Sequence, residues 1–215
     1  MFVTFEGIDG SGKTTQARRF AERLREEGEQ PLFLREPGGT ALSETIRELL
    51  LDPDREVAPM AELMMFSAAR AQLVEERIRP ALARDVPVVC DRFYDSTTAY
   101  QSGGRQLADV GWIEDLHRKV TGSLVPDRTY YIEVSLAEAR RRQQRERDTD
   151  GTTADRMESS ERTFYERVID TYRELADREP DRVVLIDGEA SPDEVHGRIW
   201  SDYQEAASQA DGTHS

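Results

Sequence analysis

A glycine-rich run near the start of the chain has the residue types and spacing that bind phosphate. Gly7-Ile8-Asp9-Gly10-Ser11-Gly12-Lys13-Thr14 fits the pattern G-x-x-x-x-G-K-[ST] without a mismatch. Glycines let the backbone turn its N–H groups towards an anion, and the start of a following helix adds partial positive charge. In this pattern the Lys13 ammonium reaches the β and γ phosphates, and the Thr14 hydroxyl holds Mg²⁺. The run therefore predicts binding of a nucleoside triphosphate.

The segments on either side of this run predict the elements that such a loop requires. Residues 1–5 form a short apolar run typical of a buried strand, and residues 16–27 carry apolar side chains at helical spacing. The pattern therefore lies where a phosphate loop must lie, after a strand and before a helix.

Short apolar runs continue to alternate with helical patterns along the chain. Further strands are predicted over 31–34, 86–90, 128–134 and 182–186, and further helices over 41–51, 61–84, 109–121, 136–147, 156–178 and 192–206. Pro80 interrupts the longest of these helices. The alternation predicts an α/β protein in three layers, with a five-stranded parallel sheet covered by helices on both faces.

No linker or repeat divides the sequence, so we expect one domain over residues 1–207 and a disordered tail over 208–215. Residues 148–154 are poor in apolar side chains and predict a mobile loop. The chain begins directly with a strand and has no apolar run long enough to span a bilayer, which predicts a cytoplasmic protein without membrane contact. Cys90, the only cysteine, ends a strand and is expected to be buried.

The composition limits the partners of the protein. A formal net charge of −14 over 215 residues argues against a nucleic-acid partner. Lys13 and Lys119 are the only lysines, so a small anionic substrate must be held largely by arginines.

Charged residues follow the predicted strands at the edge where ligands bind in a doubly wound sheet. The second strand ends in Arg35-Glu36 and the third in Asp91-Arg92, so we expect both to lie beside the phosphate loop. The planar guanidinium of Arg92 suits an acceptor phosphate, and Asp91 joins Thr14 as a candidate Mg²⁺ ligand.

An aromatic residue and an arginine share one face of the predicted helix over 61–84. Phe66 and Arg70 are one helical turn apart, so the ring can stack on a base while the guanidinium holds the phosphate of the same nucleotide. The alternative for Phe66 is a core aromatic residue.

These residues together resemble the thymidylate (dTMP) kinase family of P-loop nucleoside monophosphate kinases. The resemblance spans residues 1–205 and rests on five stretches: residues 5–15, Arg35-Glu36-Pro37-Gly38-Gly39-Thr40, residues 63–70, Asp91-Arg92-Phe93 and residues 96–101. It implies a P-loop kinase fold, a homodimer, and transfer of the γ-phosphoryl group of ATP to dTMP with Mg²⁺, giving dTDP and ADP.

The resemblance also implies roles for individual residues. The ATP phosphates are assigned to Gly7, Ile8, Asp9, Gly10, Ser11, Gly12, Lys13, Thr14 and Thr15. The dTMP site is assigned to Asp9, Arg35, Phe66, Arg70, Arg92, Thr97, Tyr100 and Gln101. In the family the acid corresponding to Asp9 bonds the deoxyribose 3′-hydroxyl, and the ring corresponding to Tyr100 crowds the ribose 2′ position, although a Tyr that only packs a helix is the alternative here.

A catalytic arginine in this family lies either in the phosphate loop or in a lid. Gly10 occupies the loop position, so the lid, about residues 142–156, is expected to supply the charge. The candidates are Arg142, Arg145, Arg147 and Arg156, acting with Lys13, Asp9 and Arg92.

Two other functions are compatible with the phosphate loop. One is a kinase for another nucleoside or nucleoside monophosphate, and the other is a non-catalytic nucleotide switch. Phe66, Thr97 and Tyr100 suit a deoxypyrimidine, and a second, arginine-lined site favours a catalyst over a switch.

Overall fold

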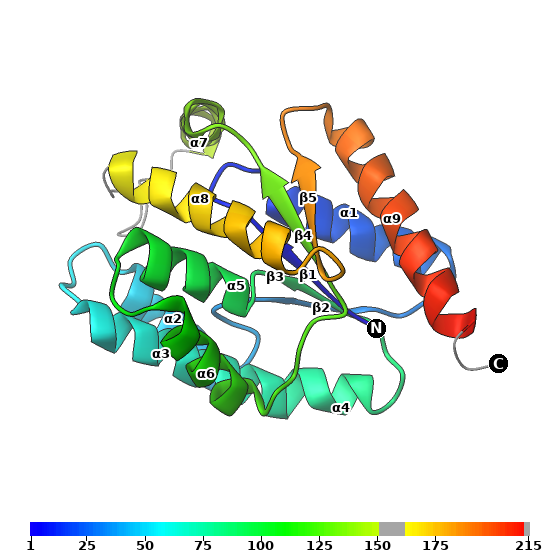
Figure 1. The fold of residues 1–215 in the computed structure, drawn as a ribbon, viewed down its shortest axis with the longest axis horizontal. Helices are drawn as coiled ribbons and strands as arrows, with labels where there is room; N and C mark the ends of the chain where they lie inside the picture. The colour runs from blue at the N-terminus through cyan, green and yellow to red at the C-terminus, as the bar shows by residue number, and fades with distance from the viewer. Residues whose placement is uncertain (151–161, 213–215) are drawn as a thin grey trace.

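The structure, a computed structural model, describes residues 1–150 and 162–212. Within these residues a single parallel sheet of five strands has the order β2-β3-β1-β4-β5 (Figure 1). The strands are β1 (Phe2–Glu6), β2 (Leu32–Arg35), β3 (Val88–Asp91), β4 (Arg128–Glu133) and β5 (Val183–Asp187). Each lies within two residues of its predicted bounds, so the predicted α/β architecture is confirmed.

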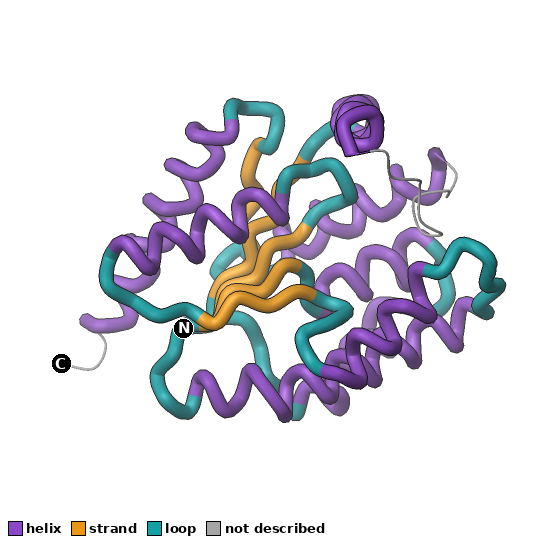
Figure 2. The backbone as a smooth tube through the Cα atoms, turned by 180° about the vertical axis from the view of Figure 1, so that it is seen from behind, coloured by secondary structure: helices purple, strands orange, loops and turns teal. Residues whose placement is uncertain are grey.

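Helices cover both faces of this sheet, as the views from the front and from behind show (Figures 1 and 2). The helices are α1 (Lys13–Glu26), α2 (Ala41–Leu51), α3 (Pro59–Leu73), α4 (Arg79–Leu82), α5 (Tyr94–Thr97), α6 (Val110–Thr121), α7 (Leu136–Asp150), α8 (Arg162–Arg178) and α9 (Pro192–Gly212), with two π-helices, η1 (Val74–Ile78) and η2 (Thr98–Gly104). Thr40 and Asp109 cap α2 and α6, because their side chains accept the N–H groups of Ser43 and Trp112.

The core is divided by the sheet, because successive side chains of a strand point to opposite faces. Phe5 and Tyr130 pack with α1 and α9 on one face. Tyr131 packs with α8 on the other face, and Phe2 packs there with the segment from α3 to α4. Cys90 is fully buried, as expected, and burial raises the pKa of its thiol. No helix in the described part of the chain is long and apolar enough to cross a membrane.

Four helical segments differ from the prediction. The helix expected over 61–84 widens into η1 before Pro80, whose ring cannot follow a regular α-helical turn. Residues 148–150, expected in a loop, continue α7, while 151–154 lie outside the described residues. Helix α9 runs to Gly212 instead of ending at 206.

The stretch 96–104, expected to lead into a helix, is itself helical and forms the end of α5 and all of η2. Gly103 and Gly104 bring η2 against α8: a Cβ added at Gly104 would lie 2.5 Å from the Phe164 ring, and one at Gly103 would collide with Thr171. The two glycines therefore allow a close approach that a larger residue would prevent.

Candidate active site

The phosphate loop has the predicted position between β1 and α1. Gly12 precedes α1 with φ of 92° and has no side chain to cap the helix, and the first N–H group, that of Lys13, donates to Ser11 Oγ at 3.3 Å. Gly10 has φ of 82°, and a Cβ built on it would collide with the carbonyl of Ala139 in α7. This contact gives a physical reason for the glycine at Gly10, because an arginine at that position would require the loop and α7 to separate.

Lys13 folds back over the loop. Its Nζ atom lies 3.0 Å from Asp9 Oδ1 and 3.4 Å from the carbonyl oxygen of Ile8, and the residue is only 6% exposed. The ammonium is thus held inside the turn that the glycines form, where the motif places the phosphates.

A hydroxyl and a carboxylate meet at the start of α1. Thr14 Oγ1 donates to Asp91 Oδ2 at 2.6 Å. The other carboxylate oxygen, Asp91 Oδ1, is buried and has no hydrogen-bond partner among the described residues. No group of three potential metal-binding side chains of the His, Cys, Asp and Glu types occurs in the described ranges. One carboxylate, one hydroxyl and substrate phosphates are nevertheless a donor set that suits Mg²⁺, so the residues present fit this ion.

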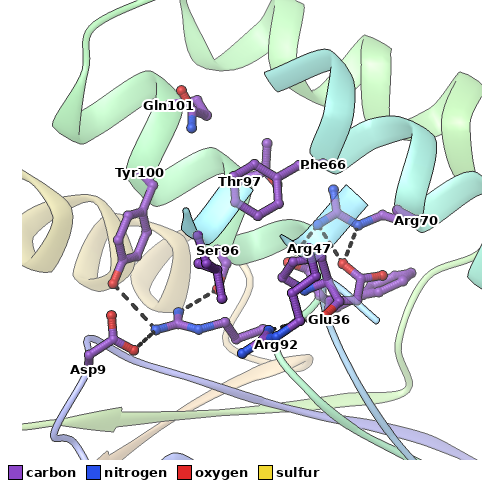
Figure 3. Close-up of a pocket in the computed structure, with 13 residues that line it drawn as sticks. Asp9, Glu36, Arg47, Phe66, Arg70, Arg92, Ser96, Thr97, Tyr100 and Gln101 are labelled. Atoms are coloured by element: carbon purple, nitrogen blue, oxygen red, sulfur yellow. Dashed lines mark hydrogen bonds and ion pairs between the residues drawn. The ribbon is translucent and has the colours of Figure 1, made fainter. Parts of the chain in front are cut away.

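A cavity beside the loop collects most of the residues predicted to bind the acceptor (Figure 3). Seven of them line it: Asp9, Phe66, Arg70, Arg92, Thr97, Tyr100 and Gln101. Phe66 is half-buried: it lines the cavity and also packs against the apolar cluster of Ile46, Leu50 and Ala69, so its contacts agree both with a role in binding and with the alternative of a core aromatic residue.

Arg92 lies at the junction of the loop and the cavity. Its Nη2 atom lies 2.6 Å from Asp9 Oδ1, its Nη1 atom donates to Ser96 Oγ at 2.9 Å, and its guanidinium lies 5.3 Å from the centre of the Tyr100 ring. Burial would raise the pKa of Asp9, but the charges of Arg92 and Lys13 outweigh it and hold that pKa well below its ordinary value. Arg92 itself has φ of 71°, a left-handed conformation that is uncommon for residues other than glycine.

Arg70 is fixed more completely than the sequence indicated. Its Nε and Nη2 atoms lie 2.8 and 2.6 Å from Glu36 Oε2, and Nη2 also donates to the Phe93 carbonyl at 3.2 Å. Within residues 1–150 and 162–212, Nη1 has no hydrogen-bond partner, and the residue is 2% exposed. Burial raises the pKa of Glu36 even though the charge of Arg70 opposes this. A guanidinium with one unpaired nitrogen suits a single hydrogen bond to a carbonyl oxygen better than the binding of a phosphate, which we expected of Arg70.

Arg35 does not reach the cavity. It is the last residue of β2, and its Nη2 atom lies 3.0 Å from Glu44 Oε2 in an exposed ion pair. Glu44 belongs to the first turn of α2. It therefore pairs with the guanidinium that we expected to bind the acceptor nucleotide.

The four predicted lid arginines have different positions. Arg142 donates to the carbonyl oxygens of Ser11 at 3.2 Å and Gly188 at 2.9 Å, so it lies against the phosphate loop. Arg145 is exposed and Arg147 is half-buried on the same helix, α7. Arg156 lies outside the described residues.

Several residues of the site did not follow from the sequence. Arg47 of α2 lines the cavity and donates to the Pro37 carbonyl at 3.1 Å. Glu6, at the end of β1, is fully buried, and burial together with the charge of Asp95 raises its pKa to about 7 despite the opposing charge of Arg92. A signal for Glu6 was present, because a carboxylate ending an otherwise apolar strand requires partners.

A phosphate loop and an arginine-lined second cavity, both at the carboxyl edge of a five-stranded parallel sheet, define a P-loop nucleotide kinase. Residues 5–199 match the family model described as thymidylate kinase. The chain therefore belongs to the thymidylate kinase family, which confirms the resemblance seen in the sequence.

Individual relatives agree with this assignment. The chain is 43% identical to the thymidylate kinase of Chlorobaculum tepidum, over 94% of this chain and 95% of that protein. It is 46% identical to the thymidylate kinase of Thermomicrobium roseum, over 93% and 92% of the two chains. Among solved structures, the crystal structure of thymidylate kinase from Ehrlichia chaffeensis matches with a TM-score of 0.77 and 35% identity, covering 95% of this chain and 98% of that one.

Proposed function

We propose that this protein is a thymidylate kinase, which transfers the γ-phosphoryl group of ATP to dTMP and yields dTDP and ADP for the synthesis of dTTP. The observation that carries the proposal is the ion pair between Asp9 and Arg92, which joins the phosphate loop to the acceptor cavity. Donor and acceptor phosphates would then lie side by side, which is the main requirement of phosphoryl transfer.

The donor half of the proposed site is the loop over residues 7–15. Its backbone N–H groups and the start of α1 would bind the phosphates of ATP, and Lys13 would neutralise charge that develops on the γ-phosphoryl group. Thr14 and Asp91 would hold Mg²⁺, which would supply further positive charge to the phosphates when it is bound.

The acceptor half uses the side chains of the cavity. Phe66 would stack on thymine, and the single open nitrogen of Arg70 would donate to a carbonyl oxygen of the base. Thr97 and Gln101 would complete the wall around the base. Their position in the cavity supports this role.

The sugar and the phosphate of the acceptor would lie nearer the loop. Arg92 would bind the acceptor phosphate with help from Arg47, which lines the same cavity. Asp9 would accept from the 3′-hydroxyl, and the Tyr100 ring would leave no room for a 2′-hydroxyl. A lid over about 142–156 would add the remaining cation; among its arginines, Arg142 has support from its contact with Ser11.

We also propose a homodimer and a cytoplasmic location. Met60 and Met64 of α3 are 43% and 41% exposed, and Trp112 of α6 is 41% exposed, which supports a self-association surface on these helices. The proposed substrates, ATP and dTMP, are cytoplasmic metabolites. Light scattering of the purified chain would test the dimer.

The proposed reaction is tested with purified protein, ATP, Mg²⁺ and one nucleoside monophosphate at a time. We expect the highest kcat/KM for dTMP, compared with dUMP, UMP, dCMP and AMP. A different preferred acceptor would favour the alternative kinase, and ATP hydrolysis that is slow and indifferent to every acceptor would favour the nucleotide switch.

A further inference from the structure

The buried carboxylate of Glu6 accepts hydrogen bonds from three parts of the chain: the end of β3, helix α5 and helix α8. Its Oε1 atom accepts the backbone N–H of Phe93 at 2.7 Å, and its Oε2 atom accepts from Tyr172 at 3.0 Å and from the hydroxyl of Ser96. The strand end, α5 and α8 thus meet at one side chain that is itself fully buried.

Two of these contacts involve groups that are bonded to Arg92, one through the peptide bond and one through a hydrogen bond. The Phe93 N–H belongs to the peptide that follows Arg92, whose φ of 71° is unfavourable for a residue with a side chain. Ser96 Oγ, which donates to Glu6, accepts from Arg92 Nη1 at 2.9 Å. Glu6 therefore holds both the backbone of Arg92 and one end of its guanidinium.

Above its pKa of about 7 the Glu6 carboxyl group is ionised, and the chemistry of its contacts fits this form. A backbone N–H and two hydroxyl groups point at its two oxygens, so every contact is a donor to Glu6. The charged groups that face it are Arg92 at the end of β3 and Asp95 of α5, and the latter is paired with Arg182 at 2.7 Å. Glu6 itself does not line the cavity, so it acts through other residues.

We propose that Glu6 is a positioning residue for the acceptor phosphate: it keeps Arg92 in its left-handed conformation and, through Ser96, aims the guanidinium at the cavity. This inference rests on the proposed function, in which Arg92 binds the phosphate of dTMP.

The test is Glu6→Gln, which keeps the shape of the side chain and removes its charge. We expect kcat/KM for dTMP to fall by about tenfold, as for a lost hydrogen bond to a charged group. The Kd for ATP, measured by titration calorimetry without acceptor, should stay within about twofold of the wild-type value. Because Glu6 immediately precedes Gly7, a merely structural role would disturb the phosphate loop and weaken ATP binding as much as the use of dTMP.

Glu133→Gln is the matched control. Glu133 also ends a strand of the sheet and lies 2.6 Å from a side chain of α8, that of Arg173, but it has no contact with the acceptor cavity. We expect it to leave both quantities unchanged. A loss of dTMP use equal to that of Glu6→Gln would overturn the proposal.

Ser96→Ala tests the connection between Glu6 and Arg92. If Ser96 transmits the effect, the double variant should be little worse than Glu6→Gln alone, whereas independent effects would multiply and contradict the inference. Should Glu6→Gln fail to fold by circular dichroism, Ser96→Ala is compared with Tyr172→Phe. This variant removes a donor to Glu6 and a hydroxyl contact with Ser96 but keeps the hydrogen bond from Arg92 to Ser96. The proposal requires the larger loss of dTMP use from Ser96→Ala.

Different results would contradict the proposed function and the proposed role of Glu6. A wild-type protein that does not use dTMP overturns the proposed function, and the role of Glu6 is then judged on the monophosphate that the wild type prefers. A wild-type protein that uses dTMP while Glu6→Gln matches it in kcat/KM overturns only the role of Glu6.

Discussion

Arg92 and Asp9 are 83 residues apart in the sequence, yet their side chains lie 2.6 Å apart. Asp9 belongs to the phosphate loop, and Arg92 follows the strand next to it in the sheet. The pair therefore fixes the distance between the part of the site that would bind ATP and the part that would bind the acceptor. A carboxylate in a phosphate loop, which by itself would repel a triphosphate, has its charge compensated in this way.

Asp9→Asn should impair the use of dTMP more than the binding of ATP. The substitution keeps the size of the side chain but removes the charge that holds Arg92 and Lys13. We expect KM for dTMP to rise by about tenfold or more. Steady-state kinetics with each substrate varied in turn measure this. A higher KM for ATP with unchanged dTMP kinetics would contradict the role assigned to Asp9.

Lys13→Ala should abolish phosphoryl transfer, because the migrating group loses its cationic partner. A loss in kcat of at least about a hundredfold is expected, while circular dichroism should show a folded protein. The sequence offers a matched control in Lys119→Ala, since Lys119 is exposed on α6 and is the only other lysine. Near-normal turnover by Lys13→Ala would mean that the loop is not the donor site.

The pKa of Glu6 predicts a pH dependence of stability. Because the folded protein raises this pKa from 4.5 to about 7, it binds a proton that the unfolded chain has released, and stability falls as the pH rises through this window. The slope is at most about 1.4 kcal/mol per pH unit.

Buried His117, whose pKa is lowered to about 2, gives the opposite slope below pH 6.5. The prediction therefore concerns the difference between two proteins. The free energy of unfolding of the wild type relative to Glu6→Gln, from urea titrations, should decrease between pH 4.5 and 7. A difference that is constant across this range would show that Glu6 does not titrate there.

If the proposed lid supplies the catalytic cation, alanine variants of its arginines should show a particular kinetic pattern. Of the single alanine variants at Arg142, Arg145, Arg147 and Arg156, one or two should lose at least about a hundredfold in kcat with ATP affinity little changed, as for an interaction made mainly in the transition state. The contact of Arg142 with Ser11 makes it the first to examine. Wild-type kcat in all four variants would place the catalytic cation elsewhere, with Arg47 and Arg92 as the next residues to examine.

The contact between the phosphate loop and α7 is tested by Gly10→Ala. Both the left-handed φ and the collision with the Ala139 carbonyl oppose a Cβ at this position. Gly28→Ala is the control, because Gly28 has a similar φ of 93° but nothing within 4 Å of the added carbon. We expect Gly10→Ala to lower the midpoint of thermal unfolding more than Gly28→Ala. Equal shifts would show that the loop does not press against α7.

The sequence was most informative where local patterns determine the structure. The glycine spacing predicted a loop between a strand and a helix, and the loop lies between β1 and α1. The helical spacing of Phe66 and Arg70 predicted a shared face, and both residues line the cavity. The pairing of Arg35 with Glu44 and the arrival of Arg47 at the cavity could not be predicted, because they depend on how α2 lies against the end of β2. The contacts of Glu6 likewise join three separate segments of the chain, at Glu6, Phe93–Ser96 and Tyr172.

The glycines of η2 limit how the range of accepted substrates can change. Gly103 and Gly104 already press the wall of the acceptor cavity against α8, so this wall has no space to recede. Room for a nucleotide analogue with a bulkier base or sugar should therefore come from shortening a side chain such as Phe66, Thr97 or Tyr100, and not from a shift of η2. Variants designed to accept larger nucleotides should shorten those three side chains and leave the backbone of residues 98–104 unaltered.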